Sequence, residues 1–209
     1  MRKLVFIVVI VAVVYKFYYT PSSTEISAYD ETGNPIVLIF TQNNCQSCDS
    51  VLSVLDDREI KYKEINLSDG KDAQISFNKY GSRTMPVLII GKRRLDGYNH
   101  GYLISALAEE YGWEVLTEEE DDAMRNHFDY EGNPAIVLYS VDWCRYCKQA
   151  QQYFEKKGVD YEDKDIETDM IAKQHYDILD GSSIPLIYVG FKRIEGFDSQ
   201  TLDEILELW

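Results

Sequence analysis

The strongest constraint on the fold of this chain is an internal repeat with one fixed offset, the 99 residues that separate Cys45 from Cys144. Each of these cysteines opens a C-x-x-C motif, which ends at Cys48 in the first copy and at Cys147 in the second. The same offset relates further landmarks: Asp30-x-x-Gly33-Asn34-Pro35 and Asp129-x-x-Gly132-Asn133-Pro134, Pro86 and Pro185, Gly91 and Gly190, and Gly97 and Gly196. So many landmarks at one offset predict a tandem duplication of one small domain.

The repeat divides the chain of 209 residues into segments. We expect a first domain over residues 29–113 and a second over 123–209, both of ordinary size for a small domain. Between them runs an acidic stretch, Glu118 to Asp122. We interpret residues 114–122 as a solvated acidic linker. The alternative is the first turn of a helix, where carboxylates suit the helix dipole.

The first twenty residues form a separate hydrophobic segment. Two basic residues, Arg2 and Lys3, precede an apolar run from Leu4 to Val14, and an aromatic cluster follows. A basic start before an apolar run predicts that residues 1–20 are a signal-anchor or a signal peptide, with a buried core helix as the third alternative. We expect an anchor, a polar tether over 21–28, and both domains on the non-cytoplasmic side of a membrane, in a periplasm or lumen.

Within each repeat the apolar pattern predicts the order β-α-β-α-β-β-α. The runs 36–40 and 135–139 are short, apolar and rich in β-branched and aromatic residues, which is typical of strands buried on both faces. A helical stripe follows each cysteine pair, and residues 86–91 and 185–190 predict later strands. The fold class is therefore α/β, with two tandem domains that each form a four-stranded mixed sheet flanked by helices.

This order resembles the thioredoxin fold, and the compact repeats that start directly at the C-x-x-C strand resemble glutaredoxins. The segment Val141-Asp142-Trp143-Cys144-Arg145-Tyr146-Cys147-Lys148 is similar to the glutaredoxin active-site loop, and Thr84-Met85-Pro86 is similar to the family's Thr-Val-Pro. The resemblance implies cis peptide bonds at Met85-Pro86 and Ile184-Pro185. Through the backbone before these prolines, a substrate chain would pair as an additional strand.

The spacing of each cysteine pair suits thiol–disulfide exchange, which needs a thiolate and a second thiol within reach. At a helix start the first sulfur lies beside unpaired N–H groups, which lower a thiol pKa. Cys45 and Cys144 are therefore the predicted nucleophiles, and Cys48 and Cys147 the resolving thiols. The alternatives are a zinc site and a static disulfide, and we expect no metal because the two pairs belong to separate repeats.

The two pairs have different neighbours. Arg145 and Lys148 favour a thiolate at Cys144, whereas Asp49 disfavours one at Cys45. Trp143 and Tyr146 add apolar contact for a substrate. We expect the second repeat to be the more reactive one. The three histidines, His100, His127 and His175, match no metal-ligand spacing and are interpreted as surface or capping residues.

The sequence after the hairpin argues against glutathione as a partner in both repeats. The glutathione-binding members of the family have Gly-Gly after the hairpin, where this chain has Asp96-Gly97 and Glu195-Gly196. A carboxylate there repels the carboxylates of the tripeptide, although Arg83, Arg94 or Arg193 would compensate in part. We therefore expect no tightly bound cofactor, and glutathione only as a disfavoured partner.

The charge balance completes the functional hypothesis. The net charge is −15, which disfavours binding to phosphate backbones, so no nucleic-acid partner is expected. The resemblance implies a thiol–disulfide oxidoreductase that acts on protein disulfides outside the cytoplasm, with a redox donor or acceptor protein and a membrane contact through residues 1–20. The alternative is a membrane-tethered binding or scaffold module with structural disulfides.

Overall fold

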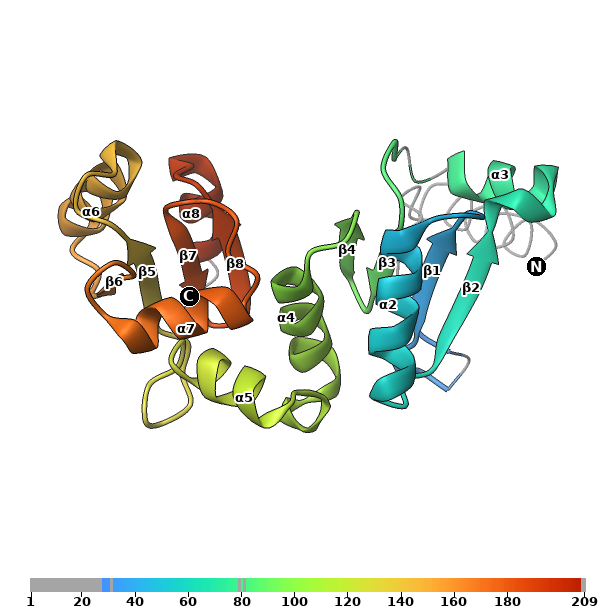
Figure 1. Ribbon diagram of the computed structural model, residues 1–209, viewed down its shortest axis with the longest axis horizontal. Coiled ribbons are helices and arrows are strands. Elements are labelled where there is room, and N and C mark those ends of the chain that lie inside the picture. Colours follow the sequence, from blue (N-terminus) through green and yellow to red (C-terminus); the bar gives the residue numbers. More distant parts are fainter. Residues whose placement is uncertain (1–27, 31, 79, 81, 208–209) are drawn as a thin grey trace, which may run out of the picture.

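Each repeat folds into its own four-stranded sheet with helices on both faces (Figure 1). A computed structural model describes residues 28–30, 32–78, 80 and 82–207. The predicted anchor or signal peptide at 1–20 and all of the predicted tether except Ala28 lie outside these residues. Ala28 itself is buried and forms a β-bridge with Gly91, so it belongs to the first domain. In the part of the chain that is described, no helix is both long and apolar enough to span a membrane.

The elements of the first domain follow the predicted order. They are β1 (Val37–Thr41), α2 (Gln46–Asp57), β2 (Tyr62–Asn66), the 3₁₀ turn η1 (Leu67–Asp69), α3 (Lys71–Asn78), β3 (Val87–Ile90), β4 (Arg93–Asp96) and α4 (His100–Tyr111). A second 3₁₀ turn, η2 (Trp113–Val115), and helix α5 (Glu118–Arg125) lead to the second domain. That domain contains β5 (Ile136–Ser140), α6 (Arg145–Lys157), β6 (Glu162–Asp165), α7 (Met170–Ile178), β7 (Leu186–Val189), β8 (Lys192–Glu195) and α8 (Ser199–Leu206).

The two sheets have the same topology. Their strand orders are β2-β1-β3-β4 and β6-β5-β7-β8. In each sheet the first two strands pair in parallel, and the other pairs are antiparallel. The crossovers through α2 and α6 join the parallel strands, because a parallel pair cannot be joined by a tight turn. This mixed topology confirms the fold class expected from the repeat.

Helices cover the central strands on both faces, and alternate residues of each strand point to opposite faces. In β1, Val37 and Ile39 pack with α2 and α4, whereas Phe40 packs on the α3 side against Phe77 and Tyr80. In β5, Ile136 and Leu138 likewise face α6 and α8. This two-sided cover holds the carboxyl end of β1 and β5, where the cysteine pairs begin.

The acidic run between the domains forms a helix. Thr117 caps α5, and its side chain and that of Glu120 make a reciprocal capping box. Glu120 is buried and forms an ion pair with Arg58 at the end of α2, with 2.7 Å between Nη2 and Oε1. Burial alone would raise the pKa of Glu120, but hydrogen bonds from His100, Thr117 and Arg58 lower it to about 2. The helix alternative therefore replaces the solvated linker that we expected.

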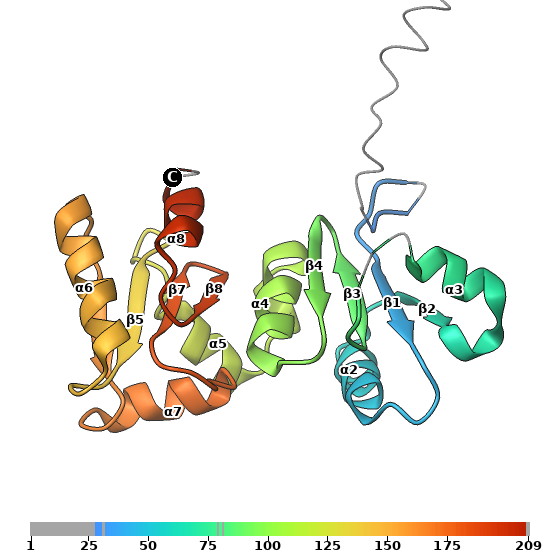
Figure 2. The ribbon, with the colours of Figure 1, turned by 90° about the horizontal axis from the view of Figure 1, so that it is seen from above.

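Helix α4 is the part of the first domain that contacts the second. It lies between the two sheets in two perpendicular views (Figures 1 and 2). Ile104 of α4 belongs to the buried cluster of the second domain. A Cβ atom at Gly101 would collide with the Leu179 carbonyl and with the Arg193 guanidinium. Lys192 also reaches back to Glu109 of α4, 2.6 Å away. The two repeats are thus packed directly against each other.

Two of the three histidines depart from the sequence interpretation as surface or capping residues. His127 is fully buried, stacks on Tyr188 at 4.0 Å between ring centroids, and has Nε2 3.0 Å from the Tyr139 hydroxyl. Burial lowers the pKa of His127 well below its ordinary value. His175 is buried as well and lies 3.1 Å from Asp122. Tyr139 of β5 and Tyr188 of β7 make the His127 position interior, which the spacing of the histidines did not reveal.

Candidate functional site

Both cysteine pairs lie where a central strand ends and a helix begins. Cys45 is the N-cap of α2, and Cys144 is the N-cap of α6. In each pair the backbone N–H of the second cysteine donates to the first sulfur, at 3.2 Å in the first domain and 3.0 Å in the second. A sulfur in this position replaces the side-chain oxygen of an ordinary cap and lies at the positive end of the helix.

Both pairs are disulfide-bonded, with Cα atoms 5.2 Å apart in each. The first sulfur-bearing residue is the more accessible one: Cys45 and Cys144 are 8% and 5% exposed, whereas Cys48 and Cys147 are 1% and 0%. An external thiolate therefore reaches the first cysteine of each pair before the second. The division into nucleophile and resolving thiol stays a prediction, and this difference in exposure favours it.

The predicted cis peptide bonds at Met85-Pro86 and Ile184-Pro185 are confirmed. In the first domain Ser47 connects the cysteine to this segment: its hydroxyl lies 3.4 Å from Cys45 Sγ and donates to the Met85 carbonyl at 3.3 Å. Thr84 is exposed, and its backbone N–H donates to the Ser82 hydroxyl at 3.2 Å. In the second domain Ile184 packs against the buried cluster that contains Cys144 and Cys147. The structure therefore brings the cysteines and the proline segments together in both domains.

The surface around the second cysteine pair is aromatic and basic. Trp143 and Tyr146 flank Cys144 and are 71% and 60% exposed, which is high for such large side chains. The Trp143 indole donates to Glu167, 3.1 Å from Nε1 to Oε1, in the loop that leads to α7. Arg145 and Lys148 are exposed on the first turn of α6.

The equivalent surface of the first domain is small and polar. Asn44, Gln46 and Ser47 take the places of Trp143, Arg145 and Tyr146, and the exposed Asp49 replaces Lys148. A groove of about 620 Å³ lies here, lined by Cys45, Met85, Tyr98 and several polar side chains. Tyr98 was not anticipated from the sequence, since it follows the hairpin rather than the cysteine motif.

The carboxylates after the hairpins are neutralised within the protein. Asp96 pairs with Arg94 at 2.7 Å, and Glu195 pairs with Arg193 at the same distance. Burial alone would raise the pKa of Asp96, but hydrogen bonds from Arg94 and Ser82 lower it. The Arg193 side chain is wholly buried and also donates to the Leu179 carbonyl and the Tyr188 hydroxyl. These ion pairs weaken the repulsion that Asp96 and Glu195 would exert on a glutathione carboxylate. They also engage the guanidinium groups of Arg94 and Arg193, which were expected to attract that carboxylate.

A second repeated contact lies just before each cysteine loop and was missed in the sequence. The hydroxyls of Thr41 and Ser140, at the ends of β1 and β5, donate to Glu64 and Asp163 on the neighbouring parallel strands. Both members of each pair recur at the offset of 99 residues, so a comparison of the two copies position by position would have revealed them. These bonds fix the strand ends from which the cysteine loops start.

A metal centre has no support among the side chains that the structure describes. They contain no group of three or more His, Cys, Asp or Glu residues arranged to hold an ion. The two cysteine pairs belong to separate sheets, as the repeat predicted, and each forms its own disulfide.

Comparison with known proteins gives the same match twice along the chain. The glutaredoxin family model matches residues 37–95 and 136–194. Among curated proteins, a glutaredoxin of Ricinus communis is 32% identical over 84 residues, which are 35% of this chain and 82% of the relative. A Pseudomonas aeruginosa glutaredoxin is 30% identical over 71 residues, with 31% and 79% covered.

A phage protein and a plant structure are also similar to this chain. The Gene 56 protein of Mycobacterium phage D29 is 32% identical over 76 residues, which are 35% of this chain and 84% of the relative. The crystal structure of wheat glutaredoxin matches with a TM-score of 0.35 and 20% identity, and the match covers 43% of this chain and 84% of that one.

Proposed function

Because this chain belongs to the glutaredoxin family, we propose that it is a thiol–disulfide oxidoreductase that acts on protein disulfides through a dithiol mechanism. The observation that carries the proposal is the geometry of Cys144 and Cys147. One sulfur is partly accessible at a helix N-terminus, and its partner is buried one turn deeper. The second domain has the more reactive pair, and the first domain acts as an electron relay, a binding platform or a slower site.

The reaction proceeds in two exchange steps that conserve sulfur and electrons. With the pair reduced, the Cys144 thiolate attacks a substrate disulfide, forms a mixed disulfide and releases one substrate thiolate, which takes up a proton. The Cys147 thiolate then attacks Cys144 Sγ and releases the second substrate thiol. Two electrons and two protons reach the substrate, and the enzyme retains a disulfide that a redox donor protein must reduce. An acceptor protein would drive the reverse reaction.

The site residues have separate roles in this proposal. The backbone before Pro86 and Pro185 pairs with the extended substrate chain, and Thr84, Met85 and Ile184 border it. Trp143 and Tyr146 contact the substrate beside Cys144. Arg145 and Lys148 stabilise a thiolate at Cys144, and Asp49 opposes one at Cys45.

The test is reduction of insulin by the full chain with dithiothreitol as the electron source. We expect turnover well above the dithiothreitol background, and loss of it when all four cysteines are replaced by serine. A thiol count separates the rival scaffold function: brief treatment with dithiothreitol should expose thiols at Cys144 and Cys147 while the protein stays folded. Turnover no faster than background, with disulfides that resist reduction until the protein unfolds, would favour a scaffold.

We also propose that residues 1–20 attach the protein to a membrane and that both domains act on its non-cytoplasmic side. The support is the basic start and apolar run of the sequence. Cell fractionation should find the full chain with membranes, and removal of residues 1–20 should release a folded protein. A full-length protein in the cytosolic fraction would contradict both the attachment and the exported substrates.

A further inference from the structure

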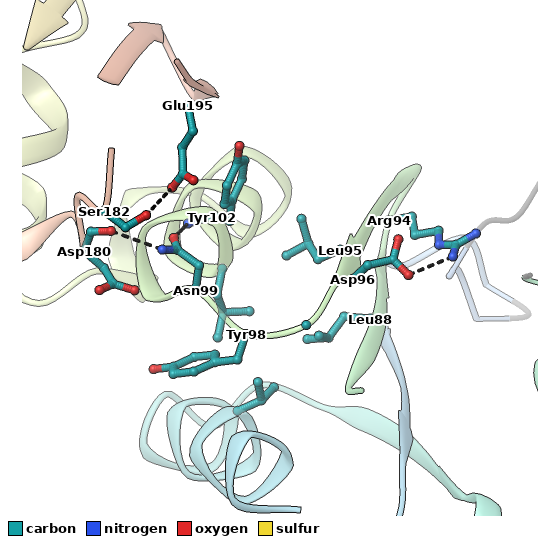
Figure 3. A pocket seen from close by; sticks show the side chains of 13 residues that line it. Leu88, Arg94, Leu95, Asp96, Tyr98, Asn99, Tyr102, Asp180, Ser182 and Glu195 are labelled. Carbon is teal, nitrogen blue, oxygen red and sulfur yellow. Dashed lines mark hydrogen bonds and ion pairs between the residues drawn. The ribbon is translucent and has the colours of Figure 1, made fainter. Parts of the chain in front are cut away.

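A pocket of about 570 Å³ lies between the two domains and has no role in the exchange steps above (Figure 3). Its first wall comes from the β3-β4 hairpin, the turn that follows it and the start of α4. Its second wall comes from Asp180, Ser182 and Glu195 of the second domain. Neither domain forms this pocket alone, so it is a product of the duplication and of the way α4 packs on the second domain.

The pocket lies next to the groove at the first cysteine pair, and the two share one lining residue. Tyr98 lines both the pocket and the groove that contains Cys45. Val51, on the pocket wall, follows Cys45 by six residues along α2, which is about 9 Å of helix. Three residues of extended chain span about 10 Å. A substrate whose cysteine lies on Cys45 therefore reaches the pocket with a side chain about three residues away.

The lining combines an apolar floor with a rim of hydrogen-bond acceptors. Leu88, Leu95 and Leu103 supply the floor. Tyr102 also lines the pocket, and it is seen with Leu88 and Leu95 in Figure 3. Two donors on the rim are already engaged: the Asn99 amide donates to the Asp180 carbonyl at 3.1 Å, and the Ser182 hydroxyl donates to Glu195 at 3.2 Å. Carboxylate oxygens remain as acceptors, so the rim suits a ligand that brings donors.

Charge singles out Asp180 among the carboxylates. Asp96 and Glu195 each pair with an arginine, as described above. The Asp180 carboxylate accepts from the backbone N–H of His100 at 3.0 Å, and no Lys or Arg among the described residues forms an ion pair with it. A cationic group from a ligand would supply the missing countercharge, and an anionic ligand would be repelled.

We propose that this pocket binds a lysine or arginine side chain of the substrate protein, about three residues from the cysteine that reacts with Cys45. The aliphatic stem lies on the leucines and tyrosines, and the cationic head pairs with Asp180. The second domain thereby sets the sequence preference of the first. The inference rests on the proposed function, because it names a feature of the substrate of the same cysteine pair.

The test uses the full chain with Cys48, Cys144 and Cys147 replaced by serine, so that Cys45 holds a mixed disulfide. Its partners are peptides with one cysteine and one variable residue, which lies three residues before or after that cysteine. The variable residue is lysine in one peptide and norleucine in its control, and every other side chain is uncharged. The mixed disulfide between Cys45 and the norleucine peptide is incubated with the lysine peptide as free thiol, so that one disulfide bond breaks as the other forms. Mass spectrometry measures the equilibrium ratio of the two mixed disulfides. We expect a preference of about fivefold for lysine over norleucine on one of the two sides, the size of a partly exposed ion pair.

Asp180→Asn keeps an acceptor for the His100 N–H but removes the charge, and it should reduce the preference below twofold. Asp160→Asn removes an exposed carboxylate elsewhere in the second domain and should leave the preference intact. Equal binding of lysine and norleucine peptides, or a preference that survives Asp180→Asn, would overturn the inference while the proposed function stands.

A second measurement needs no thiol chemistry and separates the two proposals. The lysine peptide with serine in place of cysteine is titrated into the oxidised wild-type chain, and the NMR signals of Leu95 and Tyr102 are followed. We expect shifts at millimolar peptide that the norleucine peptide does not produce. If Cys45 reacts with no peptide but these shifts occur, the redox role of the first domain fails and the pocket stands. Absence of the shifts overturns the pocket.

Discussion

The two domains keep the contacts that hold the cysteine loop and differ in what surrounds the sulfurs. Each has a cysteine as helix N-cap, a cis-proline segment, a hydroxyl–carboxylate bond between the parallel strands, and an arginine paired with the carboxylate after the hairpin. Around the sulfurs, by contrast, the exposed Trp143 and Tyr146 replace Asn44 and Ser47. The shared contacts position a disulfide, and we expect the residues that differ to adjust its reactivity and its choice of substrate.

The interiors of the domains differ as well. His127, Tyr139 and Tyr188 form a buried polar cluster in the second domain, where the first has Ala28, Phe40 and Ile89. The first interior therefore contains no titrating group at these three positions. This difference predicts that the two domains respond differently to acid, even though their backbones follow one plan.

The largest expected effect concerns the end of the first helix in each domain. Arg58 pairs with the buried Glu120, whereas its counterpart Lys157 pairs with Asp203, and both of these are nearly half exposed. Arg58→Met leaves a buried carboxylate without its guanidinium and should lower the free energy of unfolding by about 3 kcal/mol. Lys157→Met should cost under ~1 kcal/mol. Urea denaturation of both variants measures the difference, and equal losses would show that burial does not distinguish the pairs.

The next effect ranks the two cysteine pairs. Cys144→Ser should reduce insulin reduction by at least about tenfold, whereas Cys45→Ser should leave a substantial fraction, because neighbouring charge shifts a thiol pKa by about one unit. Initial rates at equal concentration of folded protein provide the measurement. Equal losses would indicate an obligatory relay between the domains, and a larger loss from Cys45→Ser would reverse the ranking.

The buried His127 predicts an acid-sensitive second domain. Desolvation, with Lys164, His175 and Arg193 nearby, lowers the pKa of His127 well below 6.5 in the folded state. Below pH 6.5 the unfolded chain binds a proton that the folded chain does not, so stability falls by up to ~1.4 kcal/mol per pH unit. Denaturation at pH 7.5 and 5.5 measures this loss. His127→Gln should reduce the slope, and an unchanged slope would assign the acid sensitivity to other groups.

The smallest expected effects come from the aromatic residues beside Cys144. Trp143→Asn and Tyr146→Ser install the residues that the first domain has at these positions, and each should raise KM for a protein disulfide about two- to fivefold with little change in kcat. The reciprocal Asn44→Trp should lower KM for the first domain in a chain that lacks Cys144 and Cys147. An unchanged KM in all three variants would remove the aromatic contribution to substrate binding.

Sequence alone was sufficient for the parts of the molecule that depend on short-range pattern. The offset between Cys45 and Cys144 predicted the duplication, and the runs at 36–40 and 135–139 predicted the central strands. The capping box at Thr117 and Glu120 was also readable, since Thr-x-x-Glu is a helix-start signature, yet the acidic composition suggested a linker.

Contacts between distant segments of the chain could not be predicted from short-range sequence pattern. The burial of His127 depends on Tyr139 and Tyr188, which lie on two strands that meet only after folding. The pocket between the domains depends on Gly101, whose missing side chain lets α4 approach the Leu179 carbonyl. No local signal marks either feature, because each is set by packing between elements far apart in the chain.

The pH dependence of alkylation tests the central claim most directly, that the surroundings of the sulfurs make Cys144 the more reactive nucleophile. Reduced protein is treated with iodoacetamide between pH 4 and 9, and each cysteine is followed by peptide mass mapping. Cys144 should react first and retain its reactivity at a pH about one unit lower than Cys45, and Asp49→Lys should narrow this gap. If Cys147 or Cys45 reacts before Cys144, or if Cys144 titrates near ~8.5 like a free thiol, the account is contradicted.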